Sequence, residues 1–226
     1  MSVSFSSAFR IAVICVSSGA VTVLGACSKA PEEPEFDYGL KKPLVRKLRA
    51  ELEETPCDKA KAQEYAQLLM SANDLKGVAR ASDTFVAACG PNVVLLQLSY
   101  TANARQGEKA KALKDATALV AVQPENASYH VWRGLSQEAL GQNEGAAADF
   151  QKAFDLQPAQ RPILNALLKT YDALNRPCDS LAALQRYVEA KPSEAKSADV
   201  QNQMKALAQQ GSCAADAGKP EAAKMP

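Results

Sequence analysis

The sequence predicts an all-α solenoid of about four helical hairpins, with a capping helix at each end. Three prolines recur at equal intervals, each after an apolar helical run: Pro124, Pro158 and Pro192. A turn residue occupies the fifteenth place of each unit, at Gly107, Gly141 and Asn175. No run of alternating β-branched and polar residues is long enough to predict a strand. Such a period indicates repeated hairpins, each of which buries its apolar face against its neighbours.

The best unit spans residues 127–158. Its small residues Gly134, Ala146 and Ala153 allow two helices to approach closely, and Phe150 lies four residues after Ala146 on the same face, where it fills the remaining gap. This pattern of small, aromatic, small and proline positions resembles the tetratricopeptide (TPR) repeat. The resemblance implies a TPR-type α-solenoid that binds protein or peptide partners.

Neighbouring units extend the array. Residues 93–124 and 161–192 keep the period with fewer of the small positions, and a weaker unit over about 60–91 precedes them. We expect a helix at about 194–210 to cover the last hairpin, because a terminal repeat otherwise exposes an apolar face.

A further helix is predicted over residues 43–54. Pro43 suits its first turn, and an apolar stripe follows, formed by Leu44, Val45, Leu48 and Leu52. Basic and acidic side chains flank this stripe, which leaves two interpretations open. The helix caps the first repeat with a solvated face, or it contacts anionic lipid headgroups or cell-wall polymer. The solenoid domain is placed at residues 43–213.

Residues 1–26 have the pattern of a secretion signal, with a polar start that ends at Arg10 and an apolar run of about 14 residues. That run is short for the roughly 20 residues of an ordinary transmembrane anchor, which is the alternative interpretation. The final residues Leu24, Gly25, Ala26 and Cys27 resemble the lipobox of bacterial lipoproteins. This resemblance implies cleavage before Cys27, a diacylglycerol on its sulfur and acylation of its amine, with palmitate as the expected chain.

Several acyl chains together hold a protein stably on a membrane. We therefore expect a lipid-anchored protein on the periplasmic face of a bacterial cell envelope. Ser28 follows the cysteine where Asp would resemble an inner-membrane retention signal, so the outer membrane is favoured over the inner one. Residues 27–42 are predicted to be a disordered, acidic tether, and residues 214–226 a disordered tail.

Four further cysteines lie in the exported domain, at Cys57, Cys89, Cys178 and Cys213. An even number suggests two disulfides, with a redox pair or a metal site as the alternatives. In the repeat architecture, Cys57 opens a hairpin that Cys89 ends, so these two residues are adjacent. Cys178 opens the last second helix, and Cys213 follows the capping helix beside it. We predict the pairs Cys57–Cys89 and Cys178–Cys213.

Composition and motifs favour binding over catalysis. The net charge of +1 gives no broad nucleic-acid footprint. His130 is the single histidine, which excludes multi-histidine sites. It stands at a position of the repeat that normally packs between helices, so we predict a packed ring. The sequence has no nucleophile elbow, phosphate-binding loop or dinucleotide fingerprint. We therefore expect no enzymatic activity, cofactor, metal or small-molecule substrate.

The TPR resemblance also implies a concave groove lined by the first helices of successive repeats. Its usual positions carry over to Val94, Gln97, Thr101, Arg105, Val131, Leu135, Glu138 and Lys169. This mixed lining suits an extended peptide or a partner helix. Trp132, close by, is either inter-helix packing or an interface anchor. The leading interpretation is a membrane-anchored TPR scaffold or adaptor for protein partners; the alternative is an accessory subunit that recruits or regulates a separate envelope hydrolase or protease.

Overall fold

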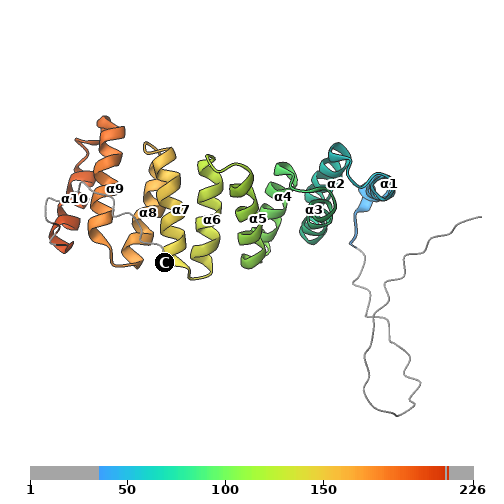
Figure 1. The fold of residues 1–226 in the computed structure, drawn as a ribbon, viewed down its shortest axis with the longest axis horizontal. Helices are drawn as coiled ribbons and strands as arrows, with labels where there is room; N and C mark the ends of the chain where they lie inside the picture. Colours follow the sequence, from blue (N-terminus) through green and yellow to red (C-terminus); the bar gives the residue numbers. More distant parts are fainter. Residues whose placement is uncertain (1–35, 212, 214–226) are drawn as a thin grey trace, which may run out of the picture. The chain divides into compact units, whose positions relative to one another are not determined.

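The computed structural model describes residues 36–211 and residue 213. In this part of the chain, ten α-helices and two short 3₁₀ helices follow one another, and no strand is present. Figure 1 shows α1 to α10 in chain order, each beside the next. The all-α solenoid that the sequence predicts is therefore confirmed.

Four helical hairpins form the body of the solenoid. They are α2 (Lys59–Ser71) with α3 (Leu75–Cys89), α4 (Val93–Arg105) with α5 (Lys109–Val122), α6 (Ala127–Ala139) with α7 (Asn143–Leu156), and α8 (Arg161–Ala173) with α9 (Pro177–Ala190). A capping helix packs at each end: α1 (Lys42–Glu54) on α2, and α10 (Ala198–Gly211) on α9. The 3₁₀ helices η1 (Gly39–Lys41) and η2 (Pro192–Glu194) precede the two capping helices.

The turn inside each hairpin requires a left-handed backbone conformation. The residues that adopt it are Asn73 (φ 63°), Gly107 (φ 73°), Gly141 (φ 76°) and Asn175 (φ 53°). Glycine reaches this region without strain and asparagine reaches it more readily than most residues, because larger or branched side chains clash there. This requirement explains why glycine or asparagine recurs at the fifteenth place of the units.

The two helices of the third hairpin approach closely at Gly134. A Cβ atom on this residue would lie 2.8 Å from Cε1 of Phe150, so only glycine fits there without a shift. Phe150, Ala146 and Ala153 are fully buried. The sequence-based account of this contact, in which small residues admit the phenylalanine ring, is confirmed.

The buried apolar side chains of residues 36–211 form four clusters along the solenoid. The largest cluster takes side chains from α7, α8, α9 and α10, where Val200 is fully buried. The C-terminal capping helix thus covers the apolar face of the last hairpin, as expected for a terminal repeat.

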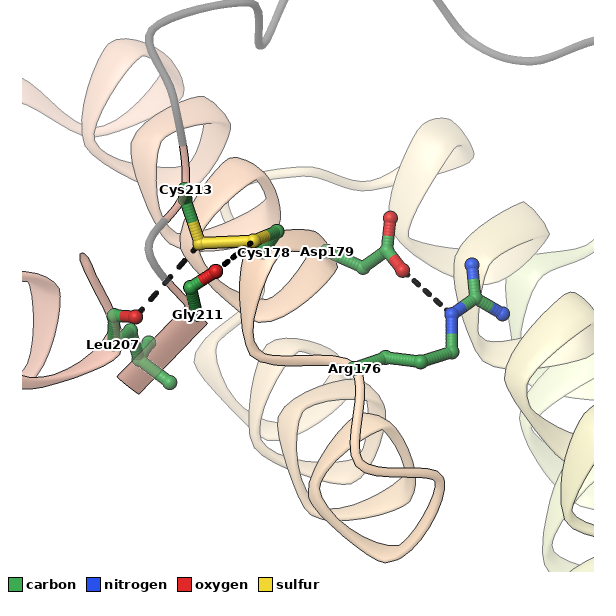
Figure 2. Close-up of a disulfide and its surroundings, with 6 residues drawn as sticks. All are labelled: Arg176, Cys178, Asp179, Leu207, Gly211 and Cys213. Atoms are coloured by element: carbon green, nitrogen blue, oxygen red, sulfur yellow. Dashed lines mark hydrogen bonds and ion pairs between the residues drawn. A yellow bond between two sulfur atoms is a disulfide. The ribbon is translucent and has the colours of Figure 1, made fainter. Parts of the chain in front are cut away.

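Two disulfides close the ends of the solenoid, in the pairings that the sequence predicts. Cys57 is joined to Cys89 and Cys178 to Cys213, each with a Cα–Cα distance of 5.5 Å. Figure 2 shows the second bond, which ties the start of α9 to the chain just after α10. With sequence separations of 32 and 35, each bond contributes about 4 kcal/mol on the chain-entropy model.

The ordered domain begins earlier than the sequence predicts. The ring of Tyr38 is buried, and its hydroxyl donates a hydrogen bond to Oδ2 of Asp74 (2.7 Å). Lys41 Nζ donates to the carbonyl and hydroxyl oxygens of Ser71, both at 2.9 Å. Tyr38 and Lys41 therefore hold this segment on the first hairpin, whereas the sequence predicts a tether over residues 27–42 because they contain so few apolar residues.

The remaining N- and C-terminal predictions concern other parts of the chain. The signal sequence, the lipidation site Cys27, the first part of the tether and the tail at 214–226 lie outside the described residues. Between residues 36 and 213, no described helix is long and apolar enough to cross a membrane.

Candidate functional site

The eight predicted groove residues all lie on first helices of hairpins. Helix α4 carries Val94, Gln97, Thr101 and Arg105; helix α6 carries Val131, Leu135 and Glu138; helix α8 carries Lys169. These eight positions are called the first-helix face below.

Hydrogen bonds and ion pairs link these positions from one hairpin to the next. Gln97 Nε2 on α4 donates to the hydroxyl of Tyr129 on α6, at 2.9 Å. Lys169 Nζ on α8 lies 2.5 Å from Glu138 Oε1 on α6. These contacts link α4 to α6 and α6 to α8.

The first-helix face mixes one prominent apolar side chain with polar groups. Leu135 is 44% exposed, and Arg105 is also exposed while its Nη2 donates to Asn73 Oδ1 (3.0 Å). The Thr101 hydroxyl donates to the carbonyl of Gln97 within its own helix. Val131 is half-buried against the core. Leu135 is thus the main apolar contact that this face offers, and its polar neighbours supply donors and acceptors.

Trp132 packs between two hairpins. Its ring stacks on Tyr100 of α4, with centroids 4.6 Å apart and planes 4° from parallel. Its carbonyl also accepts a hydrogen bond from the Tyr100 hydroxyl (3.3 Å), and its ring contacts Tyr129 at 5.5 Å between centroids. Of the two sequence-based interpretations, inter-helix packing accounts for these contacts.

A cavity of about 440 Å³ opens between α1 and the first hairpin, a feature that the sequence analysis did not anticipate. Leu52 of α1 and Phe85 of α3 contribute apolar walls, and Arg49 Nε donates to the hydroxyl of Tyr65 (3.3 Å) at its edge. Tyr38 also lines it; burial, and then the hydrogen bond to Asp74, raise the pKa of this tyrosine. The volume lies within the range of about 300–1,000 Å³ that is usual for ligand pockets.

Comparison with solved structures identifies the fold. A crystal structure of MamA is 15% identical over 69% of this chain and 95% of its own, with a TM-score of 0.56. MamA (41-end) from Desulfovibrio magneticus RS-1 is 17% identical over 71% of this chain and 89% of its own, with a TM-score of 0.54. A tetratricopeptide repeat protein from Parabacteroides merdae ATCC 43184 is 16% identical over 74% and 66%, with a TM-score of 0.52.

The fold is of the TPR type. No family model matches the sequence, and no curated protein matches it either. Because these three solved structures are only 15% to 17% identical to this chain, the similarity shows the TPR-type fold alone. It identifies neither a binding partner nor a cellular process for this protein.

The TPR-type framework encloses a buried polar cluster in its third hairpin. Asp149 on α7 accepts hydrogen bonds from Nε (2.7 Å) and Nη2 (2.6 Å) of Arg133. Its Oδ1 also lies 3.0 Å from Nδ1 of His130, whose Nε2 faces the carbonyl of Pro124 at 2.7 Å. His130 and Asp149 are buried, so the cluster joins α6 to α7 inside the hairpin. His130 is accordingly the packed ring that the sequence predicts.

The polar cluster around His130 links α6 to α7 by hydrogen bonds. Among residues 36–211 and 213, no set of three or more His, Cys, Asp or Glu side chains could hold a metal ion. The pairing of Asp149 with Arg133 and His130 was not predicted from the sequence. A signal for it exists, because an aspartate also stands at the equivalent place of the preceding repeat, at Asp115.

Proposed function

We propose that the protein is a membrane-anchored scaffold or adaptor of the bacterial cell envelope, which binds protein partners along its first-helix face. The observation that carries the proposal is the alignment of α4, α6 and α8 through Gln97–Tyr129 and Glu138–Lys169, with Leu135 exposed beside them. Aligned first helices offer one extended surface, whereas any single helix would offer only a short one.

The lipobox-like residues 24–27 support anchoring, by lipids on Cys27. The two disulfides support export, because such bonds persist in oxidising compartments such as the periplasm. Ser28 after the cysteine favours the outer membrane. Together these features support a protein that is held on the periplasmic face of an envelope membrane.

The chemistry of the first-helix face suits an extended peptide or an amphipathic partner helix. An apolar side chain of the partner would pack on Leu135, and its polar groups would reach Arg105 or the Glu138–Lys169 pair. The Lys169 side chain is largely exposed, so its ion pair contributes little to stability and can rearrange on binding.

A crosslinking pull-down from envelope fractions tests this function. We expect wild type to capture one or a few envelope proteins and the double variant Gln97→Glu/Leu135→Arg to lose them. Val122→Arg is the matched control, because Val122 is also an exposed apolar residue (40%) but lies at the end of α5, a second helix. The control should retain the captured proteins.

Equal capture by wild type and the double variant would contradict the proposed binding face. Capture of a hydrolase or protease, lost in the double variant, would establish the accessory-subunit function instead of a general scaffold. Lipid labelling of wild type, absent in Cys27→Ser, tests the anchor separately.

A further inference from the structure

Exposed apolar side chains concentrate at the N-terminal end of the described chain. The large apolar residues that are exposed there and elsewhere in residues 36–211 are Phe36, Leu40, Leu44, Val122, Leu135 and Leu140. Half of them fall within residues 36–44, and Leu40 is fully exposed. Leu40 and Leu44 are one helical turn apart, so they project from neighbouring places on η1 and α1.

The same segment carries a net positive charge. Residues 36–47 contain four lysines and arginines and one acidic residue, Asp37, and the next acidic residue is Glu51. Lys47 is mostly exposed, three residues after Leu44 on the same side of α1, and its Nζ lies 3.8 Å from Glu51 Oε1. On the same helix, Val45 and Leu48 are buried against the solenoid, and Leu44 lies at the edge of this buried stripe, 41% exposed.

We propose that residues 36–47 form a lipid-contacting surface, in which Phe36, Leu40 and Leu44 insert among the headgroups of an anionic membrane. Exposed leucine and phenylalanine beside lysine and arginine are the composition of helices that lie in the membrane interface. Basic side chains near such a surface are attracted by its negative potential whether or not they also have partners within the protein.

The positive charge of this surface favours anionic lipid over a second copy of the chain as its binding partner. A symmetric contact through this surface would bring the basic residues of two copies together, and like charges oppose such an interface. The position in the chain favours lipid as well. In the proposed lipoprotein, twelve residues separate Cys27 from Leu40, and a chain of this length spans at most about 45 Å, which keeps this surface close to the lipid.

The inference rests on the proposed membrane anchoring, and it adds a second contact that fixes how the first hairpin approaches the lipid. With the anchor alone, the solenoid would be tethered at any orientation. With α1 in the interface, the N-terminal hairpin would be held at the membrane.

A tryptophan reporter tests the contact. Trp132 is the single tryptophan, so Leu44→Trp in a Trp132→Phe background gives one probe on α1. The full chain is reconstituted into phosphatidylcholine vesicles with or without roughly 30% phosphatidylglycerol, which supplies an anionic surface, and with acyl chains brominated near the headgroup. We expect bromine to quench the Leu44→Trp reporter at least twofold in the anionic vesicles. A Val122→Trp reporter in the same background should not be quenched.

Charge variants complete the test. Lys47→Glu should lower quenching at a given lipid concentration severalfold, whereas Lys47→Arg should retain it, and raised salt should weaken it because the attraction is screened. An unquenched Leu44→Trp reporter in anionic vesicles would overturn the inference. So would a lipid-independent dimer that shields the reporter, because a second copy would then cover the surface.

The outcomes for anchor and surface are distinguishable. Lipid on Cys27 together with an unquenched reporter would leave the anchor and remove the lipid-contacting surface. A quenched reporter on a Cys27→Ser chain would keep the surface and show that it binds anionic lipid without the anchor.

Discussion

Asp115 and Asp149 occupy the same place in consecutive hairpins, and each is a buried carboxylate held by the first helix of its own hairpin. Asp115 Oδ2 accepts hydrogen bonds from the hydroxyl of Ser99 and from Nδ2 of Asn103, both at 2.8 Å. Asp149 is instead held by the guanidinium of Arg133 and the ring of His130. One aspartate therefore has neutral donors and the other a cationic one.

This difference predicts unequal effects of the same substitution. Asp149→Asn should destabilise the protein by about 3 kcal/mol, because it leaves a half-buried guanidinium without its carboxylate. Asp115→Asn should cost less than about 1 kcal/mol at neutral pH, because an amide oxygen keeps the acceptor and a buried charge is removed. Urea denaturation of both variants at neutral pH measures the two costs. Equal losses of unfolding free energy in the two variants would contradict the conclusion that the cationic donor makes Asp149 more important for stability than Asp115.

The pH dependence of Asp115 follows from the same environment. Burial raises the pKa of this carboxyl, and the hydrogen bonds from Ser99 and Asn103 offset that only in part. Because the folded pKa lies above the unfolded value of about 4, the folded state binds the proton more tightly. The contribution of Asp115 to stability is then full below the unfolded pKa and is lost as the pH rises through the folded pKa.

Wild type should therefore gain stability relative to Asp115→Asn when the pH falls from 7 toward 4. Denaturation of both proteins at pH 4, 5 and 7 gives the difference between their free energies of unfolding. The contributions of the other titrating groups cancel in this difference, because both proteins contain them. If the stability of wild type relative to Asp115→Asn were the same at all three pH values, or were lower at pH 4 than at pH 7, the raised pKa of Asp115 would be contradicted.

Much of the fold is predictable because it depends on spacing along the chain. The period of the repeats, the left-handed turn at Gly141 and the contact of Gly134 with Phe150 all follow from local pattern. The disulfide pairings follow from the helix order, since the start of one helix and the end of the next, antiparallel helix are adjacent.

Other contacts leave no periodic signal. Tyr38 reaches Asp74 from a distant segment of tether-like composition, so its burial is not visible in the sequence. The cavity beside α1 was missed for the same reason, because Tyr38 lines it. Arg133 and Asp149 each look like ordinary charged residues of a helix surface, and only the recurrence of aspartate at the repeat interval marks the site.

Gly211 is predicted to be essential for the C-terminal disulfide. A Cβ atom there would overlap Sγ of Cys213 and lie 2.7 Å from Sγ of Cys178, in the arrangement that Figure 2 shows. Gly211→Ala should therefore lower stability by roughly 2–4 kcal/mol and leave reactive thiols, although alanine is normally the better helix former.

Thiol labelling and thermal unfolding test this prediction. Gln210→Ala, at the exposed neighbouring position, is the control and should leave both measurements unchanged. An unchanged melting temperature for Gly211→Ala, with no labelled thiol, would show that the disulfide tolerates the added methyl group.

The hydroxyl of Tyr38 is predicted to fix the N-terminal segment on the first hairpin. Tyr38→Phe removes a donor from the buried Asp74 and should cost about 1–2 kcal/mol. Hydrogen exchange should also speed up at the backbone amides of residues 39–42. Tyr65→Phe is a matched control, because its hydroxyl accepts only a long, exposed hydrogen bond from Arg49, at 3.3 Å. Equal effects of the two substitutions would contradict the role of Tyr38.

The central claim is that partners bind the first-helix face. A photoreactive amino acid in place of Leu135 on α6, compared with one in place of Val122 on α5, tests it most directly in intact envelopes. Our account predicts a protein adduct from position 135 on illumination and none from position 122. Adducts from position 122 alone, or equally from both positions, would contradict it.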